Sequence, residues 1–295
     1  MQLLVFILVY PLIWLISKLP FRILYFISDV VYILIYNVLG YRKDVVRKNL
    51  KIAYPHFSDE KLKIIEKKFY HHFCDIFLEM VKSISITEKE LLARYKFTNM
   101  EVAGHYLNNN KDMILCFGHY ASYEWAISMH IYYHNKGYAV YKRIKNKYFD
   151  KMIRDVREKW KTELVVNKEA RAKVAEVMSV KHEDAVMFAF IMDQSPSNNR
   201  NKHYAPFCNV KTPFFTGVED IAKEYDLPLL FLGTKKIKRG YYEATYKVLA
   251  ENPRDFKDYE ITDMFAKALE EQIDIAPEYY FWTHKRFKFV KPLEA

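Results

Sequence analysis

Hydrophobic residues form an almost unbroken run at the start of the chain. No charged residue occurs from Met1 to Ser17, and the apolar run extends to Leu19. A membrane-spanning helix needs about 20 apolar residues, so residues 1–19 predict a membrane anchor. A second apolar run covers residues 21–40 but contains charged residues. It predicts an interfacial or docked helix in place of a second independent span.

Beyond residue 57, short apolar runs alternate with longer amphipathic stretches. A helix is predicted over 58–83, and Thr87 with Glu90 forms a capping box that starts another helix. The alternation predicts an α/β fold with a mixed, largely parallel central sheet flanked by helices. Residues 195–213 predict a long loop. The predicted strands are 113–118, 138–144, 163–166, 185–192 and 227–233, and the predicted helices are 122–135, 147–161, 169–180 and 217–225.

Composition and charge exclude several classes of protein. The chain has 46 Lys and Arg against 36 Asp and Glu, a net charge of +10, and is 51% hydrophobic, which excludes a disordered protein. Three separated cysteines exclude a disulfide framework and a cysteine-based zinc finger. No nucleic-acid recognition motif accompanies the basic charge, so we expect a membrane surface, a phosphorylated lipid or an acidic carrier protein as partner, and no nucleic acid.

A dense basic cluster follows the second apolar run. The positive-inside tendency therefore places the body of the protein in the cytoplasm. The cluster consists of Arg42, Lys43, Arg47, Lys48 and Lys51.

The strongest candidate for chemistry is the segment ILCFGHYASYEW, at the end of the first predicted central strand. His119 follows Gly118, and Glu124 comes five residues after the histidine. Five residues along a helix turn by about 140°, so the two side chains can meet only if His119 lies in the turn between strand and helix. An imidazole held by a carboxylate is a competent general base for a hydroxyl. The alternative is a hydrogen-bonded core histidine with a solvated glutamate.

This H-x-x-x-x-E pair resembles the signature of the lysophospholipid acyltransferase superfamily, and longer segments narrow the resemblance. The most specific segment is WTHKRFK, and an N-terminal RKDVVRKNLKIAYP is similar too. Together they resemble the late lipid A acyltransferases, the lauroyl and myristoyl transferases of lipopolysaccharide synthesis, over nearly the whole chain. The other similar segments are YKRIKNKYFD at 141–150, AFIMDQSP at 189–196, PFFTGVEDIA at 213–222 and APEYY before the WTHKRFK block.

The resemblance implies an O-acyltransferase that needs neither a metal nor another cofactor. It would move a fatty acyl chain from acyl carrier protein to a hydroxyl of a lipid A precursor, at the cytoplasmic face of the bacterial inner membrane. His119 would deprotonate the hydroxyl, and Glu124 would orient and polarise His119. Residues 1–40 would form the membrane anchor, single-pass or monotopic, with an interfacial helix, and residues 41–295 the catalytic domain.

Further substrate-binding residues are expected near the predicted strand ends. Arg154 and Arg157 occupy the region where the family carries a functional arginine, with Arg157 favoured, although both could be solvated helix charges. Asp193 and Gln194 end a predicted strand, at the edge that His119 shares in a parallel sheet. The Asp193 carboxylate could instead cap the following turn.

Two more groups complete the expected site. Thr216 and Gly217 open a predicted helix and resemble a family block, where a helix N-terminus could receive a phosphate or a thioester oxygen. Trp282, His284 and Arg286 combine an aromatic ring with cations, which suits a diphosphorylated glycolipid headgroup. The alternative is a basic tail packed on the edge of the domain.

Three other functions remain open from the sequence. One is the same transfer to a different lysolipid or glycolipid acceptor, and the others are a non-catalytic membrane lipid-binding protein and a hydrolase. The MDQSP segment and the polar stretch Asn198 to Asn201 depart from the family pattern. They leave the acceptor, the acylated position and the length of the acyl chain undetermined.

Overall fold

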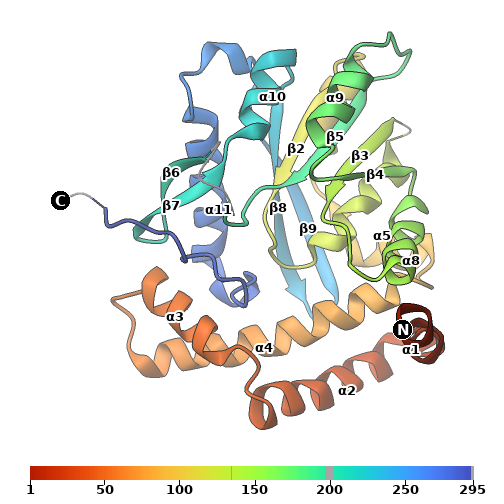
Figure 1. Ribbon diagram of the computed structural model, residues 1–295, viewed down its shortest axis with the longest axis vertical. Coiled ribbons are helices and arrows are strands. Elements are labelled where there is room, and N and C mark those ends of the chain that lie inside the picture. The colour runs from red at the N-terminus through yellow and green to blue at the C-terminus, as the bar shows by residue number, and fades with distance from the viewer. Residues whose placement is uncertain (134, 197–201, 294–295) are drawn as a thin grey trace.

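A seven-stranded sheet forms the centre of the protein in the computed structural model, which describes residues 1–133, 135–196 and 202–293 (Figure 1). All neighbouring strands pair in parallel except one long hairpin. The predicted mixed, largely parallel α/β sheet is therefore confirmed. In spatial order the strands are β1 (Tyr95–Phe97), β9 (Tyr241–Ala250), β8 (Leu229–Lys238), β2 (Met113–Phe117), β5 (Val186–Ile191), β3 (Lys136–Tyr141) and β4 (Thr162–Val166).

The central strands form where the sequence is continuously apolar. Met113, Ile114, Leu115 and Cys116 of β2 are all fully buried, because parallel strands of this kind are covered on both faces. The β8–β9 hairpin turns at Gly240, whose φ is +73°, a conformation that favours glycine. A side chain at this position would also collide with Tyr25, so the tip of the hairpin rests against the N-terminal helices.

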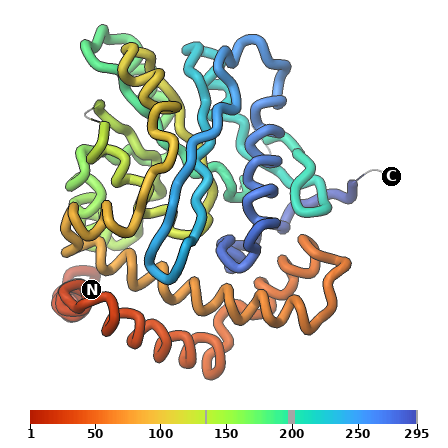
Figure 2. The backbone as a smooth tube through the Cα atoms, turned by 180° about the vertical axis from the view of Figure 1, so that it is seen from behind, coloured from red at the N-terminus to blue at the C-terminus, as the bar shows by residue number. Residues whose placement is uncertain are grey.

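The N-terminal helices gather at one end of the sheet in both views (Figures 1 and 2). The Ser122 hydroxyl, in the loop after β2, donates a hydrogen bond to Glu79 in this layer (3.2 Å). The carboxyl ends of the central parallel strands therefore face the N-terminal helices. These elements are α1 (Gln2–Lys18), α2 (Phe21–Tyr32), the π-helix η1 (Ile33–Val38), α3 (Lys43–Ala53) and α4 (Asp59–Lys82).

The structure changes the interpretation of the two apolar runs. Among the described residues, only the continuous helical stretch Phe21–Val38 is long and apolar enough to cross a membrane, and 22% of it is buried. The first run forms a continuous helix of 17 residues that contains Pro11. This helix is shorter than a membrane span requires, so its length does not meet the expectation that it is the spanning helix. The second run still packs one side on α4, where Ser28 bonds Asp75 (2.8 Å).

Bulky apolar side chains of these helices remain exposed on the surface. Many exposed apolar side chains on neighbouring helices are typical of a membrane or protein contact. The N-terminal layer is therefore a candidate membrane anchor. Its exposed residues include Leu4, Ile7, Leu8, Leu12, Trp14, Leu15, Ile23, Phe26, Val30, Ile33, Leu34, Val38, Ile64 and Phe77.

The remaining helices flank the sheet. The predicted capping box at Thr87 and Glu90 is present and begins α5. The predicted helix at 122–135 is instead a 3-10 turn followed by a single short α-helix. The elements are α5 (Glu88–Arg94), α6 (Met100–Leu107), η2 (Tyr123–Ser128), α7 (Met129–Tyr132), α8 (Lys147–Glu158), α9 (Ala170–Met178), α10 (Gly217–Tyr225), η3 (Pro253–Asp255), α11 (Glu260–Ile275) and η4 (Pro277–Tyr279).

The predicted loop at 195–213 was partly wrong. Its second part forms the antiparallel hairpin of β6 (Lys202–Phe207) and β7 (Val210–Phe215). Pro206 and Pro213 made a loop the expected structure, because proline is excluded from central strands. Proline is allowed in edge strands, and both strands of a two-stranded ribbon are edge strands. The polar stretch Asn198 to Asn201 lies outside the described residues.

Candidate active site

His119 and Asp193 meet at the carboxyl ends of two adjacent parallel strands. His119 follows β2, and Asp193 follows β5, its hydrogen-bonded neighbour. The imidazole Nδ1 lies 2.6 Å from Asp193 Oδ1, and the backbone N–H of His119 donates to Oδ2 at 3.0 Å. The carboxylate is thus held at two points, and it fixes the orientation of the ring.

Glu124 has a different partner from the one expected. Its carboxylate accepts two hydrogen bonds from the Arg157 guanidinium, at 2.6 and 3.0 Å. The predicted direct pairing of Glu124 with His119 is therefore wrong, because Asp193 occupies Nδ1. The short spacing of five residues favoured a His119–Glu124 pair in the sequence. In the structure, Arg157 of α8 binds Glu124 on the wall of the cavity instead.

Burial and charge together set the protonation of the pair. Burial by itself lowers the pKa of His119, but the charge and hydrogen bond of Asp193, with a contribution from Glu124, raise the pKa above its usual value. Burial would raise the pKa of Asp193, and His119 together with Arg286 lowers it instead. Asp193 is therefore a carboxylate at neutral pH, and it stabilises an imidazolium form of His119.

The second nitrogen of the ring is the reactive candidate. Because the Asp193 carboxylate accepts a hydrogen bond from Nδ1–H, a neutral His119 carries its lone pair on Nε2. Gln194 Nε2 lies 3.4 Å from this atom. The rings of Tyr123 and Phe281 lie 4.9 and 5.9 Å from the imidazole ring, centroid to centroid. The His119 side chain keeps 16% of its surface exposed and lines a cavity.

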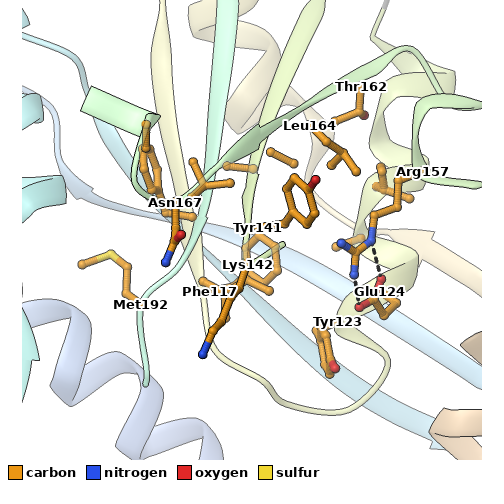
Figure 3. A pocket seen from close by; sticks show the side chains of 18 of the residues that line it. Phe117, Tyr123, Glu124, Tyr141, Lys142, Arg157, Thr162, Leu164, Asn167 and Met192 are labelled. Atoms are coloured by element: carbon orange, nitrogen blue, oxygen red, sulfur yellow. Dashed lines mark hydrogen bonds and ion pairs between the residues drawn. The ribbon is translucent and has the colours of Figure 1, made fainter. Parts of the chain in front are cut away.

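His119 opens into a cavity of about 640 Å³. Arg157 and Glu124 point toward one another on its wall beside Tyr123 (Figure 3). Deeper walls come from the faces of β3, β4 and β5 and from α10. Most of the lining is apolar, which suits a hydrocarbon chain. The apolar lining includes Met80, Phe117, Ile127, Met129, Val140, Ile153, Leu164, Phe190, Met192, Phe215, Val218 and Ile221.

The two arginines of α8 have different places. Arg157 lines the cavity with its guanidinium 21% exposed, and Glu124 holds it. Burial would lower the pKa of Arg157, and the charge of Glu124 raises it, so the guanidinium stays charged. Arg154 is instead paired with Glu158 on the exposed face of the same helix (3.2 Å). The expectation of a substrate-binding role for Arg154 is not supported by its placement.

Thr216 and Gly217 stand at the N-terminus of α10, as expected. Gly217 lines the cavity, and a side chain added there would meet no atom within 4 Å. Thr216 is buried. The nearby Glu219 carboxylate accepts hydrogen bonds from Thr262 at the start of α11. The predicted phosphate or thioester contact at this helix N-terminus remains a prediction.

Trp282 and Arg286 of the WTHKRFK block are buried, contrary to the expected headgroup surface, whereas Lys285 and Lys288 are exposed. Trp282 is fully buried, and its indole N–H donates to the Pro277 carbonyl (2.6 Å). Arg286 is 1% exposed and donates to the Pro213 carbonyl (2.7 Å). Neither side chain can meet a lipid headgroup directly, which corrects the predicted substrate-binding role of Arg286.

Arg286 instead supports the His119–Asp193 pair from behind. Its charge lowers the pKa of Asp193, and its Nη1 lies 3.2 Å from the Ser195 hydroxyl, two residues beyond Asp193. A buried carboxylate needs a compensating cation of this kind. His284 Nε2 accepts the backbone N–H of Ser195 (3.3 Å), so His284 holds the same loop.

The N-terminal basic motif contacts this C-terminal block. Asn49 of α3 donates to the carbonyls of Trp282 and His284, at 2.8 and 2.7 Å. Arg42 donates to the carbonyl of Thr283 (3.0 Å). The two segments that carry the resemblance at opposite ends of the sequence are therefore neighbours in space, and both support the loop behind Asp193.

The site defines a class of protein. A histidine held by a carboxylate on the wall of an apolar cavity, near helices that are a candidate membrane anchor, suits acyl transfer between lipid-like substrates. Among the described residues, no group of three or more His, Cys, Asp or Glu is placed to hold a metal ion.

A comparison with protein families gives the same class. The family model described as bacterial lipid A biosynthesis acyltransferase matches residues 1–289, and the chain belongs to this family. A search of curated proteins finds no match.

Proposed function

We propose that the protein transfers a fatty acyl chain from acyl carrier protein to a hydroxyl of a lipid A precursor. The observation that carries this proposal is the His119–Asp193 pair, in which His119 lines the cavity and turns its Nε2 away from the carboxylate, with the Gln194 amide 3.4 Å from Nε2. The family assignment supports acyl transfer in lipid A synthesis. The acyl carrier protein and the acceptor are inferred from the resemblance to the late lipid A acyltransferases, and the positive charge of the protein favours an acidic carrier.

In the proposed reaction, His119 acts as the general base. Nε2 takes the proton of the acceptor hydroxyl while the oxygen attacks the thioester carbonyl carbon. The resulting tetrahedral intermediate expels the carrier thiolate. The His119 imidazolium then donates its proton to this thiolate. Asp193 stabilises the imidazolium between the two proton transfers. The products are an ester of the acceptor and a free carrier thiol, so atoms and charge balance.

Glu124 acts in this proposal through Arg157. The bidentate ion pair fixes the guanidinium on the cavity wall, where a positive charge can stabilise negative charge developing on the thioester oxygen. The negative charge of Glu124 also helps to raise the pKa of His119. Glu124 is thus a positioning residue for Arg157, and not the direct partner of the base.

The proposed location is the cytoplasmic face of the bacterial inner membrane. The apolar N-terminal helices provide the anchor, and the basic cluster that follows them favours the cytoplasmic side. The proposed donor is an acidic carrier protein. The net charge of +10 on the acyltransferase favours the approach of such a donor. Acceptor and donor would thus reach the cavity from the membrane and the cytoplasm, respectively.

Mass spectrometry of the products tests the proposed function. Purified protein in detergent is incubated with acyl carrier protein bearing a fatty acyl thioester and with a lipid A precursor. The proposal predicts a product heavier than the precursor by one acyl unit. Parallel reactions with a lysophospholipid and with no acceptor separate the alternatives. Acylation of the lysophospholipid alone would change the acceptor, and rapid release of free fatty acid alone would indicate a hydrolase.

A further inference from the structure

The two apolar helices at the start of the chain lie flat against the rest of the protein. In Figure 1, α1 is seen nearly end-on, whereas α2 runs across the view beneath α4. Figure 2 shows the same arrangement from the opposite side. The axes of α1 and α2 are therefore strongly inclined to one another, and a straight path across a bilayer cannot follow both of them.

Both ends of α1 are tied to the two ends of α8. At the start, the side chain of Asn146, which caps α8, donates to the Gln2 carbonyl (3.2 Å). At the other end, the Ser17 carbonyl accepts a hydrogen bond from the Ser85 hydroxyl. The carbonyl of the residue after Ser85 accepts another from Lys159, directly after α8 (2.9 Å). α1 therefore lies beside α8 along its length.

The outer face of α8 carries ion pairs that hydrocarbon excludes. Lys151 pairs with Asp155 (2.7 Å) and Arg154 with Glu158 (3.2 Å), and each of these side chains is more than a third exposed. A charged side chain at the centre of a bilayer is strongly unfavourable. If α1 crossed a bilayer, it would carry α8 and these charges into the hydrocarbon, so the contacts of α1 exclude a crossing.

α2 and η1 follow α4 in the same way. Midway along them, Asp29 pairs with Arg239 at the tip of the β8–β9 hairpin (2.6 Å), and both side chains are more than a third exposed. A crossing of the bilayer by this stretch would place the ion pair near the bilayer centre, which is again unfavourable. The contacts along α4 are Tyr25 with Glu79, Ser28 with Asp75 and Tyr36 with Tyr70.

The outward faces of both helices are apolar and are flanked by cations. Exposed apolar residues recur every three or four positions, the spacing of one helix face. Asp29 is the only acidic residue among the first 43 of the sequence. Lys18 and Arg22 are exposed between α1 and α2, and Lys145 and Lys147 are exposed beside the start of α1. The recurring apolar residues are Leu4, Leu8, Leu12 and Leu15 in α1 and Ile23, Phe26, Val30, Leu34 and Val38 in α2 and η1.

We propose that α1, α2 and η1 lie in the plane of one leaflet of a bilayer with anionic headgroups, and that neither apolar helix crosses it. An apolar helix face with cations at its ends fits such a surface. The proposal rests on the membrane anchor of the proposed function and not on the reaction. The carboxyl ends of the central strands face these helices, so the leaflet would lie at the end of the sheet that carries His119.

Cysteine labelling in sealed membrane vesicles tests the orientation. The native cysteines are buried, so single cysteines are introduced in the full chain as Gln2→Cys, Lys18→Cys and Lys288→Cys, the last at an exposed position of the body. Each variant is treated with a membrane-impermeant maleimide, and the wild type gives the background. The proposal predicts that Gln2→Cys and Lys18→Cys react only from the side on which Lys288→Cys reacts. Reaction of either from the opposite side would overturn it, because one crossing exposes Gln2→Cys there and two crossings expose Lys18→Cys.

The depth of spin labels in vesicles gives a second readout. Labels are attached to Leu4→Cys, Leu8→Cys and Leu15→Cys, and to Val180→Cys as the control at an exposed site after α9. A helix in the plane of the leaflet places the three α1 labels at one shallow depth of about 5–10 Å, and the control label stays in water. A crossing helix would spread the depths of Leu4→Cys and Leu15→Cys by about 16 Å, which would overturn the proposal even where no maleimide reacts.

The headgroup charge and the proposed function are separated by further outcomes. Binding to vesicles that contain an anionic lipid should be at least about fivefold stronger than to zwitterionic vesicles, and equal binding would overturn the anionic surface. A protein with all α1 labels at one depth that transfers no acyl chain would overturn the proposed function alone. An active protein with a crossing helix would overturn the orientation alone.

Discussion

Replacing Asp193 with asparagine should disable His119 while leaving its shape almost unchanged. In the native site the backbone N–H of His119 donates to Oδ2 and Nδ1 lies 2.6 Å from Oδ1. An asparagine must place its single carbonyl oxygen at the backbone N–H, which leaves its NH₂ group facing Nδ1. The amide then donates to Nδ1, and the ring proton moves to Nε2. The atom that should accept the substrate proton is blocked.

The expected loss follows from this change of tautomer. We expect kcat for acyl transfer to fall by a factor on the order of 10³ to 10⁴ in Asp193→Asn, the scale of a wrong-tautomer histidine in a triad. Glu124→Gln leaves the His119–Asp193 hydrogen bond in place, so its loss should be much smaller. The comparison of the two variants identifies which carboxylate orients the base.

The pH dependence gives a second readout of the same substitution. Burial lowers the pKa of His119, and Asp193 more than offsets this in the native protein. A general base must be neutral, so kcat/KM should rise with pH through the raised pKa of His119. Removing the charge of Asp193 lowers that pKa. The rising limb of the residual activity should therefore move to lower pH.

A matched substitution elsewhere controls for general damage. His182 and Asp112 form another histidine–aspartate pair, 2.9 Å apart, before the amino end of β2. Asp112→Asn should keep acyl transfer within a fewfold of the wild type. The reasoning is refuted if Asp193→Asn, shown to be folded by circular dichroism, retains activity within a fewfold or keeps its rising limb in place.

Three further predictions follow from other parts of the structure. Arg157→Lys replaces the bidentate pair with Glu124 by a single point charge, and kcat with saturating acyl donor should fall by about tenfold to a hundredfold; an unchanged kcat would remove Arg157 from the mechanism. Ala139 of β3 lines the cavity, so Ala139→Leu should narrow the cavity and reduce transfer of the longest accepted chain by at least about tenfold relative to shorter chains; equal effects on all chain lengths would show that the acyl chain does not lie there. Burial raises the pKa of Glu79 from 4.5 to about 7, so in this pH range the carboxyl is protonated in the folded protein but ionised in the unfolded chain. The free energy of unfolding should therefore fall by about a few kcal/mol as the pH rises from about 4.5 to about 7. In thermal unfolding, Glu79→Gln should show a weaker pH dependence, and an equal slope in both proteins would contradict the prediction.

Much of the sheet could be predicted from local pattern. The strands β2 and β5 are continuous apolar runs, and the turn that carries His119 follows directly from the end of such a run. The capping box at Thr87 is visible for the same reason, since its two residues are three apart. Patterns of this range are readable because the sequence neighbours are also the structural partners.

The partner of His119 was hidden because it lies 74 residues away. The sequence did place Asp193 at the shared edge of a parallel sheet, and strand adjacency was the one signal that could have favoured it over Glu124. Nothing in the sequence shows that β5 is the neighbour of β2. The short spacing to Glu124 was therefore the more visible pattern, and it led to the wrong partner.

The basic C-terminal block shows a second limit. A cation next to an aromatic residue, on a chain of net positive charge, predicts an exposed surface site. Arg286 is instead buried, and its charge lowers the pKa of Asp193. Its burial depends on a carboxylate from a distant strand and on the Pro213 carbonyl of β7. Composition indicates that a cation is present, but only the tertiary structure shows which charge it balances.

The central claim is that His119 Nε2 accepts the proton of the acceptor hydroxyl, and one measurement tests it most directly. The rate of acyl transfer to the lipid A precursor is compared between the wild type, His119→Gln and the matched surface variant His182→Gln, each shown to be folded. The account predicts a fall of at least about a hundredfold in His119→Gln and a near-native rate in His182→Gln. A folded His119→Gln protein that transfers the chain at a rate within a fewfold of the wild type would contradict it.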